Sequence, residues 1–180
     1  MTAPVREYAE ALYGLASDEG VCDRVREDLR ALRGPIGENQ AYLRVLSAPN
    51  IAREERCGLL RDCLQGRVHP YVLNFVRLLT EKGIIRHFNE CCDVYQALYN
   101  ENHGILAVRC ASAVPLTAEQ RLRLKERLEK LTGKHVELHF TLDATCLGGL
   151  RLDYDGRRLD DTLRHRLDAM RELIQNNTTL

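Results

Sequence analysis

The side chains in this sequence that come nearest to a metal-binding set are His135, His139 and Cys146. Imidazole nitrogens and thiolates are the ligands that zinc prefers, and a zinc ion held by three of them could activate water for hydrolysis. Apolar and polar residues alternate around the two histidines, which predicts a strand, and along a strand their Cα atoms would lie roughly 13 Å apart. A single zinc ion cannot bridge that distance without a bend, so surface histidines and a packed thiol are the favoured interpretation.

A second set of candidates consists of carboxylates. Asp160 and Asp161 could act as a general acid and a general base, but they precede an apolar stripe at helical spacing, where a helix start favours a capping carboxylate. The run from Asp153 to Gly156 is similar to the start of a calcium-binding loop, yet Arg164 stands where such a loop needs a bidentate glutamate. We therefore expect a helix cap and a turn at these positions.

The seven cysteines are odd in number and scattered, without a CxxC pair, which is typical of a reduced, cytosolic chain. The phosphate-binding loop GxxxxGK[ST], the dinucleotide turn GxGxxG, the HExxH helix and the GxSxG elbow are missing from the sequence. We accordingly predict a non-catalytic protein without cofactor or bound metal. The alternative is a small cytosolic metal-dependent enzyme whose site forms between two domains, around His135, His139 and Asp153.

The charge of the chain argues against a dedicated nucleic-acid binder. Lys and Arg number 26 and Asp and Glu number 26, so the formal net charge is zero. One predicted helix has a basic face, but Leu122, Glu126 and Glu129 interrupt it, and a solvated face explains it better than contact with nucleic acid. A basic-helix RNA-binding module stays the second alternative. The basic residues concerned are Arg121, Arg123, Lys125, Arg127 and Lys130.

The first part of the chain carries six apolar stripes at spacings of three and four residues, which predict six helices within residues 1–104. The first stripe contains Val5, Ala9 and Leu12. Glycine or proline follows most of the stripes and ends the predicted helices, at Gly20, Gly34–Pro35, Pro49, Gly83 and Gly104.

After Gly104 the apolar period falls from about 3.6 residues to about 2, which predicts a domain boundary. Strands are expected over residues 105–111, 136–142 and 150–154, and we expect the last two to pair as a hairpin. The pair Asp155–Gly156 is typical of a tight turn directly after the last of these strands.

A helix is expected between the first two of these strands. Thr117 with Gln120 three residues later is a capping-box signature, and Gly133 is typical of a helix end. A final apolar stripe predicts a C-terminal helix with Leu163, Leu167, Met170 and Ile174 on one side. The predicted fold class is therefore α+β, with an N-terminal six-helix bundle over residues 1–104 followed by a small βαββα domain over residues 105–180.

No direct insertion into a membrane is expected. The longest runs without a charged residue, such as residues 68–76, contain nine residues, whereas a membrane-crossing helix needs about 20 apolar ones. The N-terminus lacks a basic segment followed by an apolar run, so we expect no signal peptide. If the protein works at a membrane, partner proteins hold it there.

Several short motifs, which occur in order along nearly the whole chain, resemble those of a known protein family. Tyr8–Tyr13 with Leu15–Ala16 is similar to an opening motif YAxAL(F/Y)xLA, and Ser112–Leu116 is similar to a junction SAxPL. Asp143–Gly149 is similar to DxxLIGG, with Cys146 in place of an aliphatic residue. Together these motifs resemble the delta-subunit family of bacterial F-type ATP synthases, which is related to the mitochondrial oligomycin-sensitivity-conferring protein.

The resemblance implies a stator role without chemistry of its own. In this family one copy joins the catalytic head, an alpha/beta hexamer, to the peripheral stalk of a proton-translocating complex. The helical domain binds the amphipathic N-terminal helix of an alpha subunit with its first and fifth helices, and the C-terminal domain binds the b subunits of the stalk. The implied location is the cytoplasmic face of the bacterial plasma membrane, where partner subunits hold the protein peripherally.

The resemblance also implies candidate contact residues. Gly148 and Gly149 are the stalk-binding candidates, since glycine at the start of a strand permits close approach of another backbone; a turn required within the domain is the alternative. Ala11 is a small residue among large ones, which lets a partner helix come close. Internal packing is the alternative for every apolar residue of the alpha-binding set, which comprises Tyr8, Ala11, Leu12, Leu15, Phe75, Leu78 and Lys82.

Overall fold

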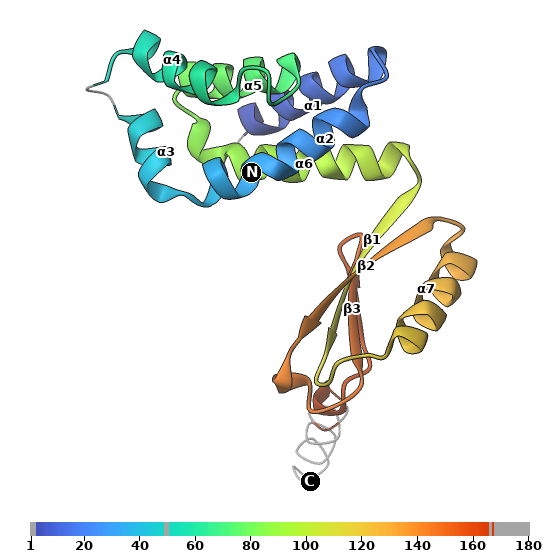
Figure 1. Cartoon of the computed structure of the whole chain (residues 1–180). Helices are drawn as coiled ribbons and strands as arrows, with labels where there is room; N and C mark the ends of the chain where they lie inside the picture. The colour runs from blue at the N-terminus through green and yellow to red at the C-terminus, as the bar shows by residue number, and fades with distance from the viewer. Residues whose placement is uncertain (1–2, 49–50, 166, 168–180) are drawn as a thin grey trace, which may run out of the picture. The chain divides into compact units, whose positions relative to one another are not determined.

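The computed structural model describes residues 3–48, 51–165 and 167. The chain divides into two compact units, Met1–Tyr99 and Asn100–Leu180. The first is helical and the second contains a four-stranded sheet with a helix (Figure 1). The expected mixture of helices and sheet is confirmed.

The helices of the first unit follow the apolar stripes of the sequence. In the first helix, Val5, Ala9, Leu12 and Ala16 recur at spacings of three and four residues and are all buried. The elements are α1 (Ala3–Asp18), α2 (Cys22–Leu32), the π-helix η1 (Arg33–Glu38), α3 (Gln40–Ser47), α4 (Arg53–Leu64), α5 (Pro70–Glu81), the 3₁₀ turn η2 (Ile85–His87) and α6 (Phe88–Asn102), which extends past the end of the first unit.

The segment after α2 differs from the simple break that Gly34–Pro35 predicts, because the chain continues as the π-helix η1. Gly37 in η1 has no room for a side chain: an added Cβ would lie 1.9 Å from Oδ1 of Asn89. The Nδ2 of Asn89 donates to the Gly37 carbonyl at 3.0 Å. Because the partner comes from a distant helix, the local sequence pattern does not reveal this requirement.

Two buried polar contacts tie α2 to its neighbours. Asp28 is only 6% exposed, and its Oδ2 accepts a hydrogen bond of 2.6 Å from the backbone N–H of His69, at the start of α5. The hydroxyl of Tyr95 on α6 donates to the carbonyl of Cys22 at 3.1 Å. Since a helix start has backbone N–H groups without partners inside the helix, Asp28 completes α5 from another element.

The second unit has the sheet order β2-β1-β3-β4, and the helix α7 lies along one face of the sheet (Figure 1). Its core consists of Leu106, Val108, Leu128 and Val136, with partly buried leucines and Tyr154 around them. The elements are β1 (Ile105–Ser112), α7 (Ala118–Thr132), β2 (His135–Leu142), the 3₁₀ turn η3 (Ala144–Cys146), β3 (Leu150–Tyr154) and β4 (Arg157–Asp160).

The expected hairpin between residues 136–142 and 150–154 is wrong. β1 lies between these two strands, pairing parallel with β2 and antiparallel with β3. The helix α7 connects β1 to β2 and so allows the parallel arrangement, which a short turn does not.

Other local predictions for the second unit are confirmed. The Thr117 hydroxyl accepts from the Gln120 N–H at 3.2 Å, and the Gln120 side chain accepts from the Thr117 N–H at 2.9 Å, which makes the capping box complete. Gly133 ends α7 with a φ of 66°. Helical residues begin again at Leu163. Met170 and Ile174 of the expected C-terminal helix lie outside the described residues.

Candidate functional site

One side of α1 carries an apolar stripe that the unit's core does not use. Tyr8, Ala11 and Leu15 recur at spacings of three and four residues, so they lie on one side of the helix beside its buried face. Ala11 is exposed, Tyr8 is half-buried, and Leu15 is 53% exposed. A leucine this exposed at helical spacing from other apolar residues is a candidate contact for a partner helix.

The fifth helix presents a matching edge. Leu78 is half-buried and Lys82, at the C-terminal cap of α5, is exposed. Tyr71, the second residue of α5, donates a hydrogen bond from its hydroxyl to the Glu19 carboxylate directly after α1. This contact turns the edge of α5 that contains Tyr71, Leu78 and Lys82 toward α1, since residues at spacings of four and seven share one side of a helix.

The α1 and α5 helices run in opposite directions. The Glu19–Tyr71 bond joins the end of α1 to the beginning of α5. At the other end, the Cys91 thiol lies 3.8 Å from the Val5 carbonyl near the start of α1, and Cys91 is in the first turn of the helix that follows α5 through η2. We refer to the exposed and half-buried residues of this pair, Tyr8, Ala11, Leu15, Leu78 and Lys82, as the α1–α5 surface.

The other two alpha-binding candidates lie inside the unit. Leu12 is 4% exposed and Phe75 is 6% exposed, because each falls on the buried side of its helix. In this structure they support the α1–α5 surface from below and do not form part of it. Tyr71 and Glu19, which hold the two helices together, were missed by the sequence analysis. They are 52 residues apart, and neither belongs to a recognisable motif.

The two stalk-binding candidates lie in a turn whose second position requires glycine. Gly149 has a φ of 80°, and an added Cβ would lie 2.2 Å from the carbonyl oxygen of Asp161. An added Cβ at Gly148 would lie 2.8 Å from Cδ1 of Leu163, and the Gly148 carbonyl accepts from the Leu163 N–H at 3.0 Å. The alternative given by the sequence, a turn required within the domain, therefore accounts for Gly149, while Gly148 is held in the same turn by its bond to Leu163.

Exposed leucines surround this turn. Leu147 directly precedes it and is 64% exposed, as is Leu142 at the end of β2. Leu163 packs against Gly148 and is also exposed. Ser112 at the end of β1 pairs with Leu142 on one side and with Leu150 on the other, which brings these segments to the same end of the sheet. We refer to Leu142, Leu147 and Leu163 as the sheet-end surface.

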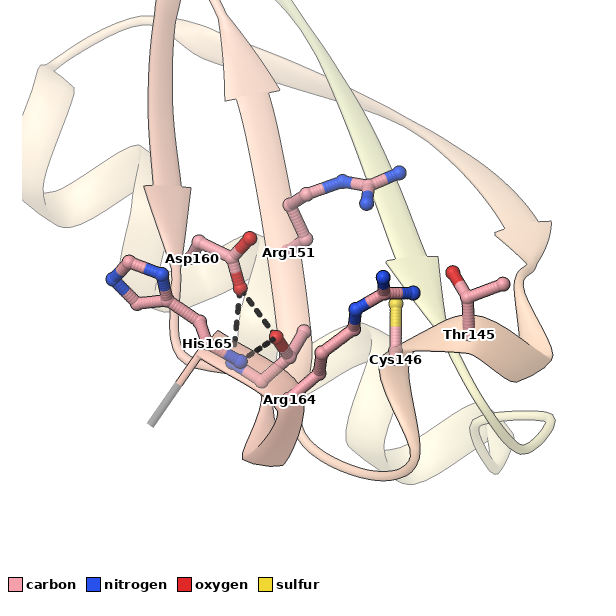
Figure 2. A pocket seen from close by; sticks show the side chains of 7 residues that line it. Thr145, Cys146, Arg151, Asp160, Arg164 and His165 are labelled. Atoms are coloured by element: carbon pink, nitrogen blue, oxygen red, sulfur yellow. Dashed lines mark hydrogen bonds between the residues drawn. The ribbon is translucent and has the colours of Figure 1, made fainter. Parts of the chain in front are cut away.

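A small polar cavity of about 170 Å³ lies behind the same turn (Figure 2). On its wall Asp160 accepts hydrogen bonds from the backbone N–H and the hydroxyl of Thr162, at 3.1 and 2.7 Å, and these bonds are the main reason that the pKa of Asp160 is lowered. The Thr162 hydroxyl in turn accepts from the His165 N–H at 3.2 Å. The helix cap expected from Asp160 or Asp161 is therefore made by Thr162, which Asp160 orients.

The cavity does not contain an activated nucleophile. Cys146 is only 2% exposed, and burial raises the pKa of its thiol, with the charges of Asp143 and Asp160 adding to the effect. The two adjacent thiols of α6 behave in the same way: burial raises the pKa of Cys91 to about 11 and that of Cys92 to about 12. A thiol with a raised pKa is protonated at neutral pH and is a poor nucleophile.

The residues of the metal-enzyme alternative have other partners. His135 lies 3.1 Å from the Glu129 carboxylate, and Asp153 accepts a hydrogen bond of 2.6 Å from Arg158. His139 pairs with Arg109 on β1, and Arg109 pairs with Asp153 on β3, so a whole strand separates the histidine from the carboxylate. Within residues 3–48, 51–165 and 167, no group of three or more His, Cys, Asp or Glu side chains could hold a metal ion.

The basic face of α7 is largely engaged in contacts within the unit. Arg123 bonds to Glu119 at 2.6 Å, and Lys125 lies 3.7 Å from Glu129. The guanidinium of Arg121 lies 4.7 Å from the centre of the Phe140 ring. These contacts are those of a solvated helix face.

In the part of the chain that the structure describes, no helix is long and apolar enough to span a membrane.

Comparison with known proteins decides the family. The sequence model of the ATP synthase delta (OSCP) subunit family matches residues 5–174. The chain belongs to this family. The ATP synthase subunit delta of Salinibacter ruber is 34% identical over 173 residues, which are 96% of this chain and 91% of the relative. That of Synechococcus elongatus is 33% identical over 161 residues, 89% of each chain.

The fold comparison agrees with this assignment. A chain in the mitochondrial ATP synthase hexamer of Toxoplasma gondii superposes with a TM-score of 0.74 at 20% identity, covering 97% of this chain and 98% of that one. At this identity the likeness establishes the fold alone. As a member of the delta (OSCP) family, the protein is a peripheral-stalk component of an F-type ATP synthase.

Proposed function

We propose that the protein is a non-catalytic stator connector with two separate attachment surfaces. The helices α1 to α6 form a six-helix bundle that binds the catalytic head, the alpha/beta hexamer, through the N-terminal helix of an alpha subunit. The second unit, with the element order β1-α7-β2-β3-β4, binds the b subunits of the peripheral stalk. In this role the protein lies at the cytoplasmic face of the bacterial plasma membrane in a proton-translocating complex, held there by its partners.

The observation that carries the head contact is the exposed apolar stripe of the α1–α5 surface. Leu15 is more than half exposed, although the buried side of the same helix packs into the core of the unit. Ala11 is exposed beside it and has only a small side chain. An amphipathic helix with apolar residues at spacings of three and four can cover such a stripe and bring its backbone close at the alanine. Burial of the leucine then contributes roughly 1–2 kcal/mol to binding.

The stalk contact rests on the sheet-end surface. Three exposed leucines at one end of a small sheet form an apolar area that the unit's own core does not cover. The two glycines predicted as contacts act indirectly here: their turn sets the positions of Leu147 and Leu163. We therefore assign stalk binding to the leucines and a positioning role to Gly148 and Gly149.

Two linked attachments suit a stator mechanically. The rotor's torque must be resisted while the catalytic sites cycle, so slow dissociation matters more than fast association. Once one surface is bound, the second binds at the high effective concentration that the chain imposes. Neither surface then needs exceptional affinity, which fits their modest extent.

The experiment that tests the head contact is a calorimetric titration of the full chain with a peptide of the alpha subunit's N-terminal helix from the same organism. We expect saturable one-to-one binding, and we expect Ala11→Trp to weaken it about tenfold or more, because the large ring keeps the partner helix away. Ala97→Trp, at an exposed position of α6, is the matched control and should bind as the wild type does. Absence of binding by the folded wild-type chain would refute the proposed contact.

A further inference from the structure

The two ends of the α1–α5 surface carry different charge. Glu19 and Tyr71 mark one end, and Tyr8 and Lys82 are each eleven residues away from that contact, along antiparallel helices. At the usual rise of a helix, eleven residues correspond to about 16 Å, so Tyr8 and Lys82 lie together at the opposite end.

The end at Glu19 is acidic. Asp18 and Glu19 are both exposed there, and the hydrogen bond from Tyr71 to Glu19 keeps that carboxylate beside α5. This bond is the largest cause of a raised pKa of Tyr71, and the negative charges of Glu19 and Asp18 raise it further. The two side chains together contribute a formal charge of minus two.

The opposite end has a different balance. Lys82 and Arg53, whose guanidinium donates to the neighbouring Glu81 carbonyl at 2.7 Å, contribute two positive charges, and the exposed Glu7 of α1 contributes one negative charge. The neighbouring acids are already paired: Glu81 lies 3.4 Å from Arg77, and Glu10 lies 2.6 Å from Arg6. The surface is thus more negative at the end of α1 than at its beginning.

Resting on the function proposed above, we infer that this charge difference fixes the direction of the bound helix: its N-terminal end lies beside Asp18 and Glu19 and its C-terminal end beside Lys82. A helix carries about half a positive charge at its N-terminus and half a negative charge at its C-terminus, so this direction places each end against the opposite sign. The partner then runs antiparallel to α1 and parallel to α5.

This direction defines the chemistry of the partner segment. Its first turn carries net positive charge, from a chain-terminal ammonium group or a basic side chain, and faces the two carboxylates. Its last turn presents carbonyl groups or a carboxylate that Lys82 can contact. The apolar residues between them cover Ala11 and Leu15.

The test uses the full chain, labelled for NMR, with two versions of the alpha-subunit N-terminal peptide that carry a spin label at one end or the other. The N-terminal label should broaden the amide signals of Glu19 and Tyr71, and the C-terminal label those of Tyr8 and Lys82. In parallel, we expect Asp18→Lys and Lys82→Glu each to weaken binding about twofold to fivefold at low salt. Glu38→Lys, in η1, is the control for a change of net charge alone.

The outcomes separate the direction from the contact itself. Binding with the reversed broadening pattern, or with both labels affecting both ends equally, would overturn the inferred direction and leave the proposed function standing. A charge effect no larger than that of Glu38→Lys would likewise overturn the role of the end charges. Absence of any peptide binding would refute the proposed head contact and the direction with it.

Discussion

The two candidate surfaces of this protein are constructed differently. The α1–α5 surface consists of side chains on two regular helices. The residues that fix these helices, such as Asp28 at the start of α5 and Tyr71 between α5 and the end of α1, are different from the residues that form the surface. The sheet-end surface follows an irregular turn, in which a Cβ added at Gly149 would overlap the carbonyl oxygen of Asp161. Binding and folding are therefore separable at the first surface, whereas at the second they are coupled through the glycine turn that positions the exposed leucines.

The largest effect that this difference predicts is that of Gly149→Ala. A Cβ at this position would overlap the Asp161 carbonyl oxygen, and the φ of 80° is unfavourable for any residue with a side chain. We expect the second unit to lose about 2–4 kcal/mol of stability, measured by amide hydrogen exchange of its sheet residues in the full chain. Exchange of the first unit's amides should not change.

Gly156→Asn is the matched control for that change. Gly156 also has a positive φ, of 71°, but no atom lies within 4 Å of an added Cβ, and asparagine tolerates this conformation. Its effect should be well below that of Gly149→Ala. Equal effects of the two substitutions would contradict the role assigned to the close contact with Asp161.

The next largest effect belongs to the first unit. Asp28→Ala leaves the His69 N–H at the start of α5 without its buried acceptor, which should cost about 1–3 kcal/mol in the free energy of unfolding by urea. Asp28→Asn retains an acceptor oxygen and should recover most of the loss. An unchanged stability of Asp28→Ala would show that α5 does not depend on this cap.

A smaller effect is expected at the helix start behind the sheet-end surface. Thr162→Val keeps the shape of this buried residue but removes the hydroxyl that accepts from His165 and donates to Asp160. We expect a loss of about 1 kcal/mol in the second unit, visible by the same exchange measurement. Thr162→Ser keeps the hydroxyl and should lose less; the reverse order would contradict a capping role.

The smallest effect concerns pH. Because hydrogen bonds from Thr162 lower the pKa of Asp160 in the folded protein, the charged form of this carboxylate favours folding. Its contribution is present above the ordinary value of 3.8 and is lost as the pH falls through the lower value of the folded state. Asp160→Asn should therefore make stability less dependent on pH below about 4, as followed by circular dichroism; an unchanged pH profile would contradict it.

Local signals in the sequence predicted local structure well. The capping box of Thr117 and Gln120, the helix end at Gly133 and the turn at Asp155–Gly156 depend on contacts between residues close in the chain, and all three are confirmed. The apolar stripes of the helices could be predicted for the same reason, since periodicity reports which residues share one side of an element.

Pairing between distant segments could not be predicted. Alternation in residues 136–142 shows that one face of a strand is buried, but it does not show which strand lies beside it, and the hairpin prediction failed there. In the same way, the family resemblance placed Leu12 and Leu15 in one alpha-binding set, although one is 4% and the other 53% exposed. That distinction depends on which helices cover α1, which is a property of the whole unit.

The claim that the two surfaces are separate attachments is tested most directly by placing one substitution in each surface and measuring the binding of both partners. Full-length chains carrying Leu15→Asp or Leu147→Asp would be titrated with the alpha-subunit N-terminal peptide and, separately, with the b-subunit stalk fragment. Both leucines are exposed, so both variants should stay folded. We predict that Leu15→Asp loses only the alpha peptide and Leu147→Asp loses only the stalk fragment. The account would be contradicted if one folded variant bound neither partner, or if both variants still bound both partners.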